Sequence, residues 1–480
     1  MKKTFSNIFF NTTYQIFLVI VPIITAPYLS RVLGANNMGK YSFVETIINL
    51  FTTVGLIGLY DYGTREIAYV RDKSKKEISK TFFEITLTRA ILLVFSLTIY
   101  WIYIAHSPYR FYFMCAMIWL IANFLDPTWF FNGMEKFKLI TIRNFIIKLT
   151  MIVLIFVMVK GKNDLYKYFY IIGIGQMISI LLLVPNLKRY IGFYKFKDFN
   201  IIKHLKPTIK VFLPQIAALV YTQLDKVMIE ALTPNIANVT FYDNAEKIVK
   251  VPLAVITSIN LVLMPNNANL FIKGKLEEVK KIINNTIQVV LMITLPMTFG
   301  LASIGFTLIP WYLGAEFVEV GYIIVWLTPI IVALALSGIS ANQYFIATNK
   351  THYLTKSYVY AAVLNVIVNY LFIPRMGCYG AALGTVTAEM VSVVIQYYYM
   401  SKDINIISSF KSVVKYLISS VIMCIISVFI GKTLGYKVST TMIQIAVSVL
   451  IYCIALIVSK DKLVYQFFSQ VKIKLKRENI

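Results

Sequence analysis

Long apolar runs separated by short polar stretches cover almost the whole chain. The runs are roughly 18 to 25 residues long, which is the length that an α-helix needs to span a hydrocarbon core of about 30 Å. Strands of an outer-membrane barrel would instead be segments of ~10 residues with alternating apolar and polar positions. The pattern predicts about fourteen transmembrane helices, at residues 8–30, 41–60, 83–104, 111–132, 139–159, 165–185, 208–230, 241–263, 283–309, 320–347, 353–373, 378–400, 412–431 and 440–459.

The composition supports a membrane protein. Of the 480 residues, 58% are hydrophobic and 14% are charged, and the mean hydropathy is +0.71. A soluble domain carries about 25% charged residues, so this chain has more apolar side chains than a water-soluble core can bury. We predict an all-α integral membrane protein.

The formal net charge of +25 could indicate nucleic-acid binding, so the positions of the basic residues matter. When residues at the ends of the predicted spans, such as Arg143, are counted with the adjoining connection, 33 of the 47 Lys and Arg residues fall in the terminal segments and every second connection, and nine fall in the other connections. Such an asymmetry places the more basic side, with both termini, in the cytoplasm. The basic start resembles a signal peptide, but its apolar run continues to Leu29 without a cleavage site, which predicts a first span. The basicity therefore indicates topology, and we expect no nucleic-acid partner.

A weak internal repeat divides the chain. A Tyr and a Glu at the entry to the second span, Tyr41 and Glu45, recur 201 positions later at the entry to the eighth span as Tyr242 and Glu246. An aromatic pair before a lysine, Phe130-Phe131 before Lys136, recurs 214 positions later as Tyr344-Phe345 before Lys350. Many transporters consist of two such halves with the substrate between them. We predict a first lobe at 1–205 and a second at 206–405 around a central cavity, with two further helices and a basic tail at 406–480.

Prolines interrupt two predicted spans, Pro22 and Pro27 in the first and Pro214 in the seventh. Proline leaves a backbone carbonyl without its helical donor, which a membrane tolerates only beside protein or water. One interpretation is a harmless kink. The other is that these helices line the cavity and bend as gates during transport.

Five short stretches share the pattern of a known family; they are Pro27–Gly34 with Gly39 and Tyr41–Phe43, Gly58–Ala68, Leu224–Ile229, Tyr242–Lys247 and Pro374–Ala382. They resemble bacterial polysaccharide-export flippases, the O-antigen and capsule unit flippases of the multidrug/oligosaccharidyl-lipid/polysaccharide exporter superfamily. The resemblance implies a transporter of the cytoplasmic membrane that uses no cofactor and makes no covalent bond. It also implies an undecaprenyl-pyrophosphate-linked oligosaccharide as substrate, moved from the inner to the outer leaflet by alternating access. Further partners would be the bilayer and the polymerase and glycosyltransferases of the same pathway.

Basic residues inside spans are candidates for contacts to the substrate diphosphate, because charges in a membrane are costly unless they face a cavity or a partner. Arg89 and Lys148 lie about two turns into the third and fifth spans and have no opposite charge at helical spacing; the alternative for both is snorkelling to the interface. The other candidates have bland explanations, since they can pair four residues away or lie near span ends; they are Lys226, Lys250, Lys247 and Arg31.

Acidic residues inside spans are candidates for ion coupling, since a coupled proton or sodium ion needs a membrane carboxylate whose charge changes with access. Asp225 lies in the proline-containing seventh span and Glu389 in the middle of the twelfth. Asp126 precedes Pro127 and could instead cap a half-helix, and Glu45 belongs to the repeated Tyr-Glu pair. Each acid could alternatively neutralise a basic residue of a neighbouring helix.

Three alternative functions remain open. A cation-coupled multidrug exporter of the same superfamily generally has twelve helices, and a peptidoglycan-precursor flippase fits the segment Tyr62–Glu66 less well than the polysaccharide branch does. A membrane glycosyltransferase or ligase would need a catalytic cluster and a long outer loop, and the sequence offers neither. The four Cys and three His are scattered, so we expect no metal site. The sequence has no Walker-type phosphate loop, which predicts transport without ATP hydrolysis by this chain.

Overall fold

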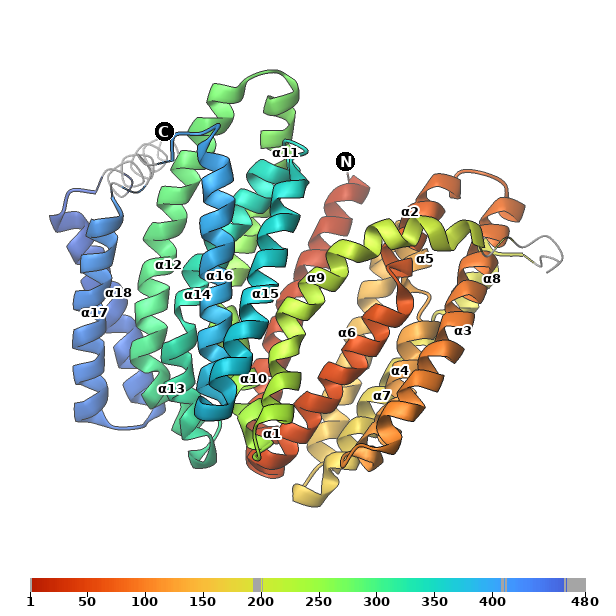
Figure 1. Cartoon of the computed structure of the whole chain (residues 1–480), viewed down its shortest axis with the longest axis horizontal. Coiled ribbons are helices and arrows are strands. Elements are labelled where there is room, and N and C mark those ends of the chain that lie inside the picture. The colour runs from red at the N-terminus through yellow and green to blue at the C-terminus, as the bar shows by residue number, and fades with distance from the viewer. Residues whose placement is uncertain are drawn as a thin grey trace. The chain divides into compact units, whose positions relative to one another are not determined.

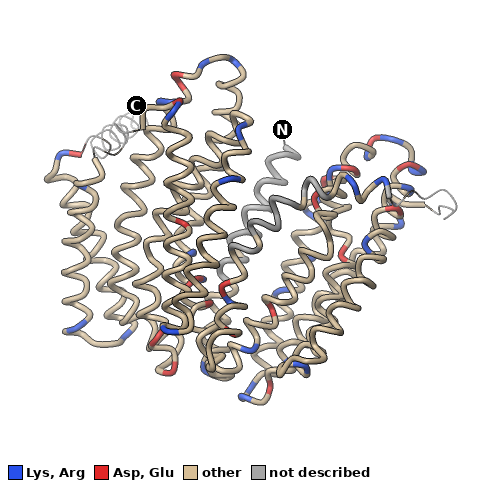
Figure 2. The backbone as a smooth tube through the Cα atoms, viewed as in Figure 1, with Lys and Arg blue, Asp and Glu red and all other residues tan. Residues whose placement is uncertain are grey.

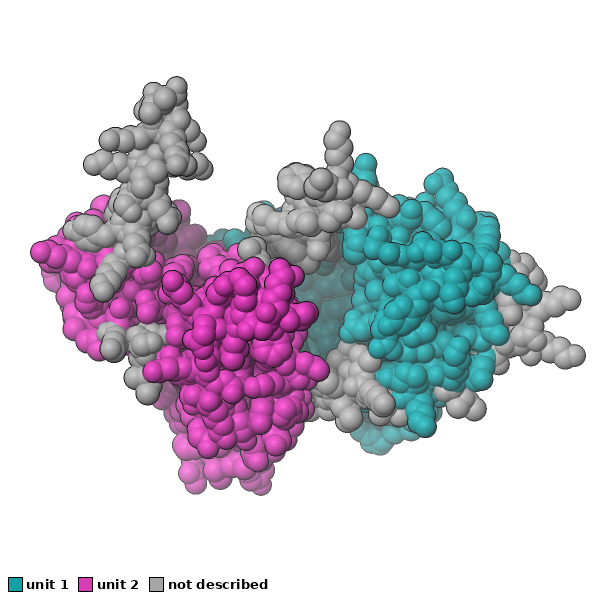
Figure 3. Space-filling model, turned by 90° about the horizontal axis from the view of Figure 1, so that it is seen from above, with its two compact units in different colours: residues 1–240 teal, residues 241–480 magenta. Residues whose placement is uncertain are grey.

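The computed structural model describes residues 2–192, 200, 202–406, 410, 412–461 and 463. Within these, side chains are described except at 2–16, 18–20, 202, 209–211, 213–218, 220–221 and 261–262. The chain forms two compact units, unit 1 at residues 1–240 and unit 2 at 241–480 (Figure 3). Every regular element of the described residues is helical, which confirms the predicted fold class.

Unit 1 contains the elements up to α9, and α10 crosses its boundary with unit 2 (Figure 1). The elements are α1 (Lys2–Leu56), α2 (Leu59–Val70), α3 (Lys75–Ala105), α4 (Arg110–Leu125), α5 (Thr128–Gly133), α6 (Phe137–Met158), η1 (Lys162–Asp164), α7 (Leu165–Leu181), α8 (Val184–Tyr190), α9 (Ile202–Leu232) and α10 (Ala237–Lys250).

Unit 2 contains the remaining elements. They are α11 (Leu253–Ile272), α12 (Leu276–Tyr312), η3 (Ala315–Phe317), α13 (Val318–Leu327), α14 (Pro329–Gly338), the π-helix η4 (Ile339–Ile346), α15 (Thr351–Met376), α16 (Cys378–Ser401), α17 (Val413–Leu434) and α18 (Val438–Val458). Lys and Arg gather at helix ends and in the connections, and few lie along the middle of helices (Figure 2).

Eleven helices of the described residues are long and apolar enough to cross a membrane, or twelve if the bent pair Val21–Leu56 and Leu59–Val70 is one span. The exact number of fourteen is therefore not confirmed. The two predicted spans outside this count, 8–30 and 208–230, run through residues whose side chains are not described. Both ranges are helical, in α1 and α9.

Helix α1 covers the first two predicted spans, which meet at a kink at Gly34. The backbone angles of Gly34 are φ 76° and ψ 168°. A side chain disfavours this conformation, so glycine lets the chain change direction there. Pro22 and Pro27 lie inside α1. Their proposed role as gates stays a prediction, and the side chain of Pro214 lies outside the described residues.

The internal repeat is visible in the backbone at the turn after the aromatic pair. Glu135 and Asn349, 214 positions apart, both have a left-handed backbone, with φ of 55° and 58°. The next residue closes the same turn in both units, with 2.9 Å from Lys136 N to Phe131 O and 2.8 Å from Lys350 N to Phe345 O. Helices α6 and α15 then begin at positions 137 and 351, again 214 apart. Residues of the two units can therefore be matched one to one around this turn.

Helices α2 and α5 pack closely in unit 1 because Gly133, at their contact, has no side chain to hold the two backbones apart. A Cβ added to Gly133 would lie 2.6 Å from Thr64 O and 2.7 Å from Ile67 Cβ. We expect Gly133→Ala to destabilise the protein by about 1–3 kcal/mol, since the helices must separate to admit the methyl group. Thermal unfolding in detergent measures this effect. Gly161→Ala is the matched control, because a Cβ there meets nothing within 4 Å. An unchanged melting temperature for Gly133→Ala would contradict the close packing.

The last two helices of unit 2 are joined to α12 by buried polar side chains. Gln444 of α18 accepts a hydrogen bond from Thr307 Oγ1 at 2.6 Å and donates to Ser427 O at 2.8 Å. Ser303 and Ser427 are hydrogen-bonded at 2.8 Å. In a membrane, apolar surface gives little drive for helix association, so such contacts hold helices together.

Candidate functional site

The helical backbone is interrupted at Asp126 and Pro127, between α4 and α5, and the carbonyl groups at the end of α4 there need hydrogen-bond donors. The last carbonyls of a helix have no partner within it. Arg89, on α3, supplies donors to two of them, with 2.9 Å from Nε to Phe124 O and 2.9 Å from Nη2 to Asn123 O. Its side chain is 2% exposed, and Nη1 has no hydrogen-bond partner among the described residues. Arg89 therefore caps the C-terminal end of α4. Its contact with a diphosphate stays a prediction.

Asp126 organises the other side of the break. Its Oδ1 accepts hydrogen bonds from Thr128 N at 3.1 Å and from Thr128 Oγ1 at 2.5 Å. The same oxygen lies 3.8 Å from Nη1 of Arg143 on α6. Arg143 is buried and also donates to Thr128 Oγ1 at 3.0 Å and to Ser179 O of α7 at 3.3 Å. One guanidinium thus joins α5, α6 and α7 beside a carboxylate.

A cavity of about 230 Å³ lies beside this ion pair inside unit 1. Its lining is rich in groups that form hydrogen bonds, and comprises Tyr60, Asp126, Thr128, Arg143, Asn144, Ile147, Lys148, Met151, Gln176, Ser179 and Ile180. Two of these residues are cationic and one is anionic, so the lining carries a formal charge of about +1. Guanidinium and ammonium groups are the side chains that bind phosphate oxygens most strongly. The cavity can therefore hold an anion, provided that Asp126 keeps its own partners.

Unit 2 offers an internal comparison for these charges. The offset of 214 matches Asp126, Arg143 and Lys148 to Ser340, Ser357 and Ala362. The matched helices are again joined through a buried side chain: Ser340 Oγ donates to Gln396 Oε1 at 2.6 Å, and Gln396 Nε2 donates to Ser357 Oγ at 3.1 Å. Neutral groups thus hold the same helices together in unit 2. The fold does not require the charges of unit 1, which points to a function for them.

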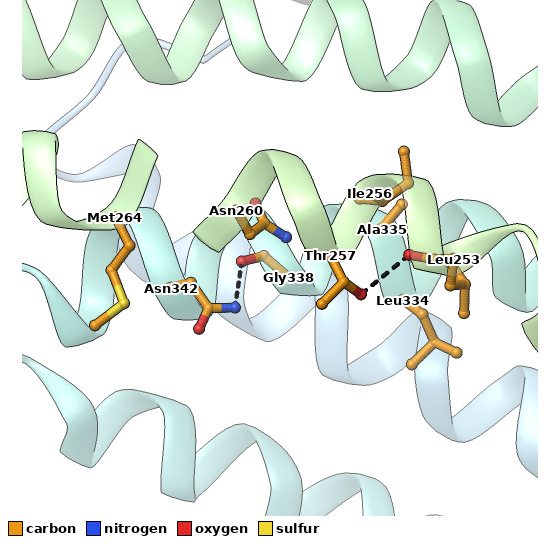
Figure 4. Close-up of a pocket in the computed structure, with 9 residues that line it drawn as sticks. All are labelled: Leu253, Ile256, Thr257, Asn260, Met264, Leu334, Ala335, Gly338 and Asn342. Carbon is orange, nitrogen blue, oxygen red and sulfur yellow. Dashed lines mark hydrogen bonds between the residues drawn. The ribbon is translucent and has the colours of Figure 1, made fainter. Parts of the chain in front are cut away.

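A second cavity, of about 280 Å³, lies between α11, α14 and η4 of unit 2 (Figure 4). It is lined by Leu253, Ile256, Thr257, Asn260, Met264, Leu334, Ala335, Gly338 and Asn342. None of these lining residues is charged, and Asn342 corresponds to Thr128 at the offset of 214. Asn342 Nδ2 and Thr257 Oγ1 donate to the backbone carbonyls of Gly338 and Leu253 (Figure 4). The lining of this cavity is therefore neutral.

The structure corrects the assignment of Arg143 to a cytoplasmic connection. Arg143 lies in the second turn of α6 and is 7% exposed. Its partners Thr128 and Ser179 are 15 and 36 positions away, so helical spacing gave no sign of them.

The remaining candidates lie elsewhere in their units. Lys148 lies within electrostatic reach of Glu45, whose Oε1 accepts a hydrogen bond from Tyr41 Oη at 3.1 Å. The predicted pair of Glu246 and Lys250 is confirmed at 2.6 Å. Lys247 pairs with Asp243 at 2.7 Å, and Arg31 is exposed on α1. Three further candidates are buried, Asp225 and Lys226 in α9 and Glu389 in α16. Glu230 lines a cavity with Tyr103 and His106.

Comparison with known proteins identifies the family. The model of the polysaccharide biosynthesis protein family matches residues 5–271, which is more than half of the chain. The chain belongs to this family. A candidate O-antigen transporter of Shigella dysenteriae is 24% identical to it over 379 residues, covering 78% of this chain and 94% of the relative.

Solved structures show that this member of the family shares a known transporter fold. Lipid II flippase MurJ in an inward closed conformation superposes with a TM-score of 0.72 at 16% identity, over 95% of this chain and 100% of that chain. An inward-facing multidrug resistance MATE family transporter of the MOP superfamily gives a TM-score of 0.60 at 13% identity, over 82% of this chain and 99% of that chain. The chain is thus a multi-span membrane protein with the MurJ and MATE fold.

Proposed function

We propose that this protein is a flippase for lipid-linked oligosaccharides and that the unit 1 cavity holds the diphosphate of the lipid carrier. One observation carries the site: two cations and one anion line the cavity of unit 1, whereas the matched positions of unit 2 hold the neutral residues Ser340, Ser357 and Ala362. The family match and the related O-antigen transporter support the class of substrate. The substrate would be an oligosaccharide on undecaprenyl pyrophosphate, used for O-antigen, capsule or another surface polysaccharide.

The chemistry of the cavity suits this task. A diphosphate carries at least two negative charges, and moving them unassisted through hydrocarbon costs many kilocalories per mole. Arg143 offers a planar fork for two phosphate oxygens, and Lys148, five positions further along α6, offers a compact charge. Asp126 orients Arg143 through the 3.8 Å ion pair. We infer that the substrate exchanges its hydration for these donors without any covalent bond being made.

We also propose a transport cycle for this protein. The substrate is picked up at the inner leaflet of the bacterial cytoplasmic membrane and released at the outer leaflet by alternating access, with both termini in the cytoplasm. The basic asymmetry of the connections supports this orientation. The lobes at 1–205 and 206–405 remain our proposal for the moving parts. Asp225 and Glu389, which are 2% and 5% exposed, remain candidates for a coupled ion.

A peptidoglycan-precursor flippase and a multidrug exporter are the alternatives that share this fold. The multidrug exporter rests on a likeness of fold alone. The peptidoglycan-precursor flippase is also supported by a sequence relative, Lipid II flippase MurJ of Bacillus subtilis. The cationic lining favours an anionic substrate over the organic cations that a drug exporter carries. The diphosphate is common to both lipid-linked substrates, so the sugar distinguishes them.

Binding measurements test the proposed site. We expect Arg143→Gln and Lys148→Gln each to weaken binding of a polyprenyl-diphosphate oligosaccharide about 10- to 100-fold, because each removes a charge-assisted contact of roughly 1.5–3 kcal/mol. The measurement is titration of the purified protein in nanodiscs. Lys160→Gln is the matched control, since Lys160 is exposed directly after α6. Unchanged affinity in both cavity variants would remove the cavity from the binding site.

A further inference from the structure

A buried chain of three titratable side chains lies outside the cavity, where α2, α3 and the start of α9 meet. Tyr62 Oη lies 2.9 Å from His204 Nδ1, and His204 Nε2 lies 2.9 Å from Glu84 Oε2. Tyr62, Glu84 and His204 are 3%, 2% and 1% exposed. The other carboxylate oxygen, Glu84 Oε1, accepts a hydrogen bond from Asn200 N at 3.0 Å. The cluster thus fastens the beginning of α9 to α3.

Helix α3 holds the chain on both sides of the segment that leads into α9. Ser79 Oγ accepts a hydrogen bond from Gly192 N at 2.8 Å, one turn before Glu84 receives Asn200. Asn200 Oδ1 in turn accepts from Lys203 N at 3.1 Å. Any movement of the start of α9 away from α3 must therefore break the contacts of Glu84 and His204.

In unit 2 the connection after α16 is attached through an amide and through an ion pair between Asp403 and Lys350. Helices α3 and α12 begin at positions 75 and 276, which is the repeat offset of 201. Asn284 of α12 donates to Asn405 O, after α16, at 3.2 Å. An amide thus fastens the connection that follows the last helix of its repeat, as Glu84 does in unit 1. The two attachments differ in burial: Lys350 and Asp403 of unit 2 are partly exposed, whereas the imidazole of His204 and the carboxylate of Glu84 are both buried.

We propose that Glu84, His204 and Tyr62 form a proton-binding site that closes the start of α9 onto α3 when one proton is bound. The inference rests on the proposed transport cycle only in assigning a use to this movement. An ionised Glu84 can only accept, so His204 Nε2 carries its hydrogen and donates to it. Neutral His204 then accepts from the Tyr62 hydroxyl at Nδ1. The arriving proton binds Nδ1, which donates to Tyr62 Oη, and the phenol turns from donor to acceptor.

Charge counting gives the direction of the effect. Without the proton the buried cluster carries the net negative charge of Glu84, and with it the cluster is an ion pair with no net charge. Burying an uncompensated charge costs several kcal/mol, so the closed arrangement is favoured with the proton bound. The charged groups facing the cluster do not cancel Glu84: Arg65 lies 5.4 Å from the Tyr62 ring and also 3.8 Å from Glu66. Closure is therefore favoured as pH falls and is lost as pH rises.

Distance measurements by electron spin resonance test the site on the whole purified protein. Spin labels at residues 73 and 203, both exposed, report the separation of the α3 and α9 ends in a background with Ser at the four native cysteines. We expect one narrow distance at the acidic end of a pH series and a longer or broader distribution at the alkaline end. The closed-to-open ratio changes by at most about tenfold per pH unit, because one proton is bound.

Two variants and a control separate a proton site from simple packing. His204→Gln keeps a donor for Glu84 but binds no proton, so we expect distances that do not change with pH. Glu84→Gln leaves His204 to bind the proton without a counter-charge, so we expect the pH response to reverse, with the closed distance lost as pH falls. His352→Gln, at an exposed histidine of α15, should keep the wild-type pH response. A full pH response in His204→Gln, or none in the wild type, would overturn the proposal. The labels need no substrate, so a pH response in a protein that flips no lipid would contradict the proposed function and leave this site standing.

Discussion

Exchanging the charged residues of the unit 1 cavity for their matched residues in unit 2 should abolish transport and leave the fold intact. The change is Asp126→Ser, Arg143→Ser and Lys148→Ala, which copies Ser340, Ser357 and Ala362. We expect transport to fall more than about 100-fold, because two phosphate contacts of roughly 1.5–3 kcal/mol each are lost together. Removing the ion pair as a unit leaves no unpaired buried charge, so stability should change little.

The measurement is export of surface polysaccharide in cells that depend on this protein, with membrane level and thermal unfolding as fold controls. Arg143→Lys with Lys148→Arg keeps the charges and should retain part of the activity. Should the triple variant not fold, Arg143→Gln with Lys148→Gln tests the same charges with less change in volume. Wild-type export by a folded triple variant would show that the charges of the cavity have no role in transport.

The membrane potential should drive transport strongly if the diphosphate crosses with its charges uncompensated. An inside-negative potential favours the outward movement of two negative charges by about 2.3 kcal/mol per charge per 100 mV, or about 5 kcal/mol in all at 100 mV. This corresponds to more than a thousandfold in the equilibrium ratio between the leaflets. Reconstituted vesicles with the potential, the pH gradient and the sodium gradient set separately measure the effect.

Ion coupling through the two candidate carboxylates is tested in the same vesicles. If a coupled proton or sodium ion is carried by Asp225 or Glu389, Asp225→Asn or Glu389→Gln should remove one gradient dependence and keep the response to potential. Unchanged dependences in both variants would make the potential alone the better account. A transport rate indifferent to potential would contradict uncompensated movement of the diphosphate.

The fold could be predicted from the sequence because apolar runs of roughly 18 to 25 residues allow little but membrane-spanning helices. The repeat was also readable, since the turn after Phe130-Phe131 and Tyr344-Phe345 keeps a left-handed residue at Glu135 and Asn349 in both units. The predicted break between the first two spans corresponds to the kink at Gly34, and the exact number of spans is not confirmed because the predicted spans 8–30 and 208–230 run through residues whose side chains are not described.

The candidate site was only half predictable. Lys148 was identified because a charge deep in an apolar span is costly, and the pair of Lys250 and Glu246 because its residues are four apart on one helix. Arg143 and its partners come from different helices, so their contacts depend on tertiary packing that no local spacing records. The role of Arg89 at the end of α4 likewise depends on the break at Asp126, which a hydropathy pattern does not locate.

Flipping of a defined substrate by the purified protein tests the central claim most directly. Vesicles containing the protein and a polyprenyl-diphosphate oligosaccharide with a fluorescent sugar are treated with a membrane-impermeant quencher, which reports the fraction in the outer leaflet. We expect wild-type vesicles to move the lipid between leaflets, the Arg143→Gln and Lys148→Gln double variant to match empty vesicles, and Lys160→Gln to match the wild type. Wild-type vesicles no faster than empty ones, with the protein folded and the potential applied, would contradict the account.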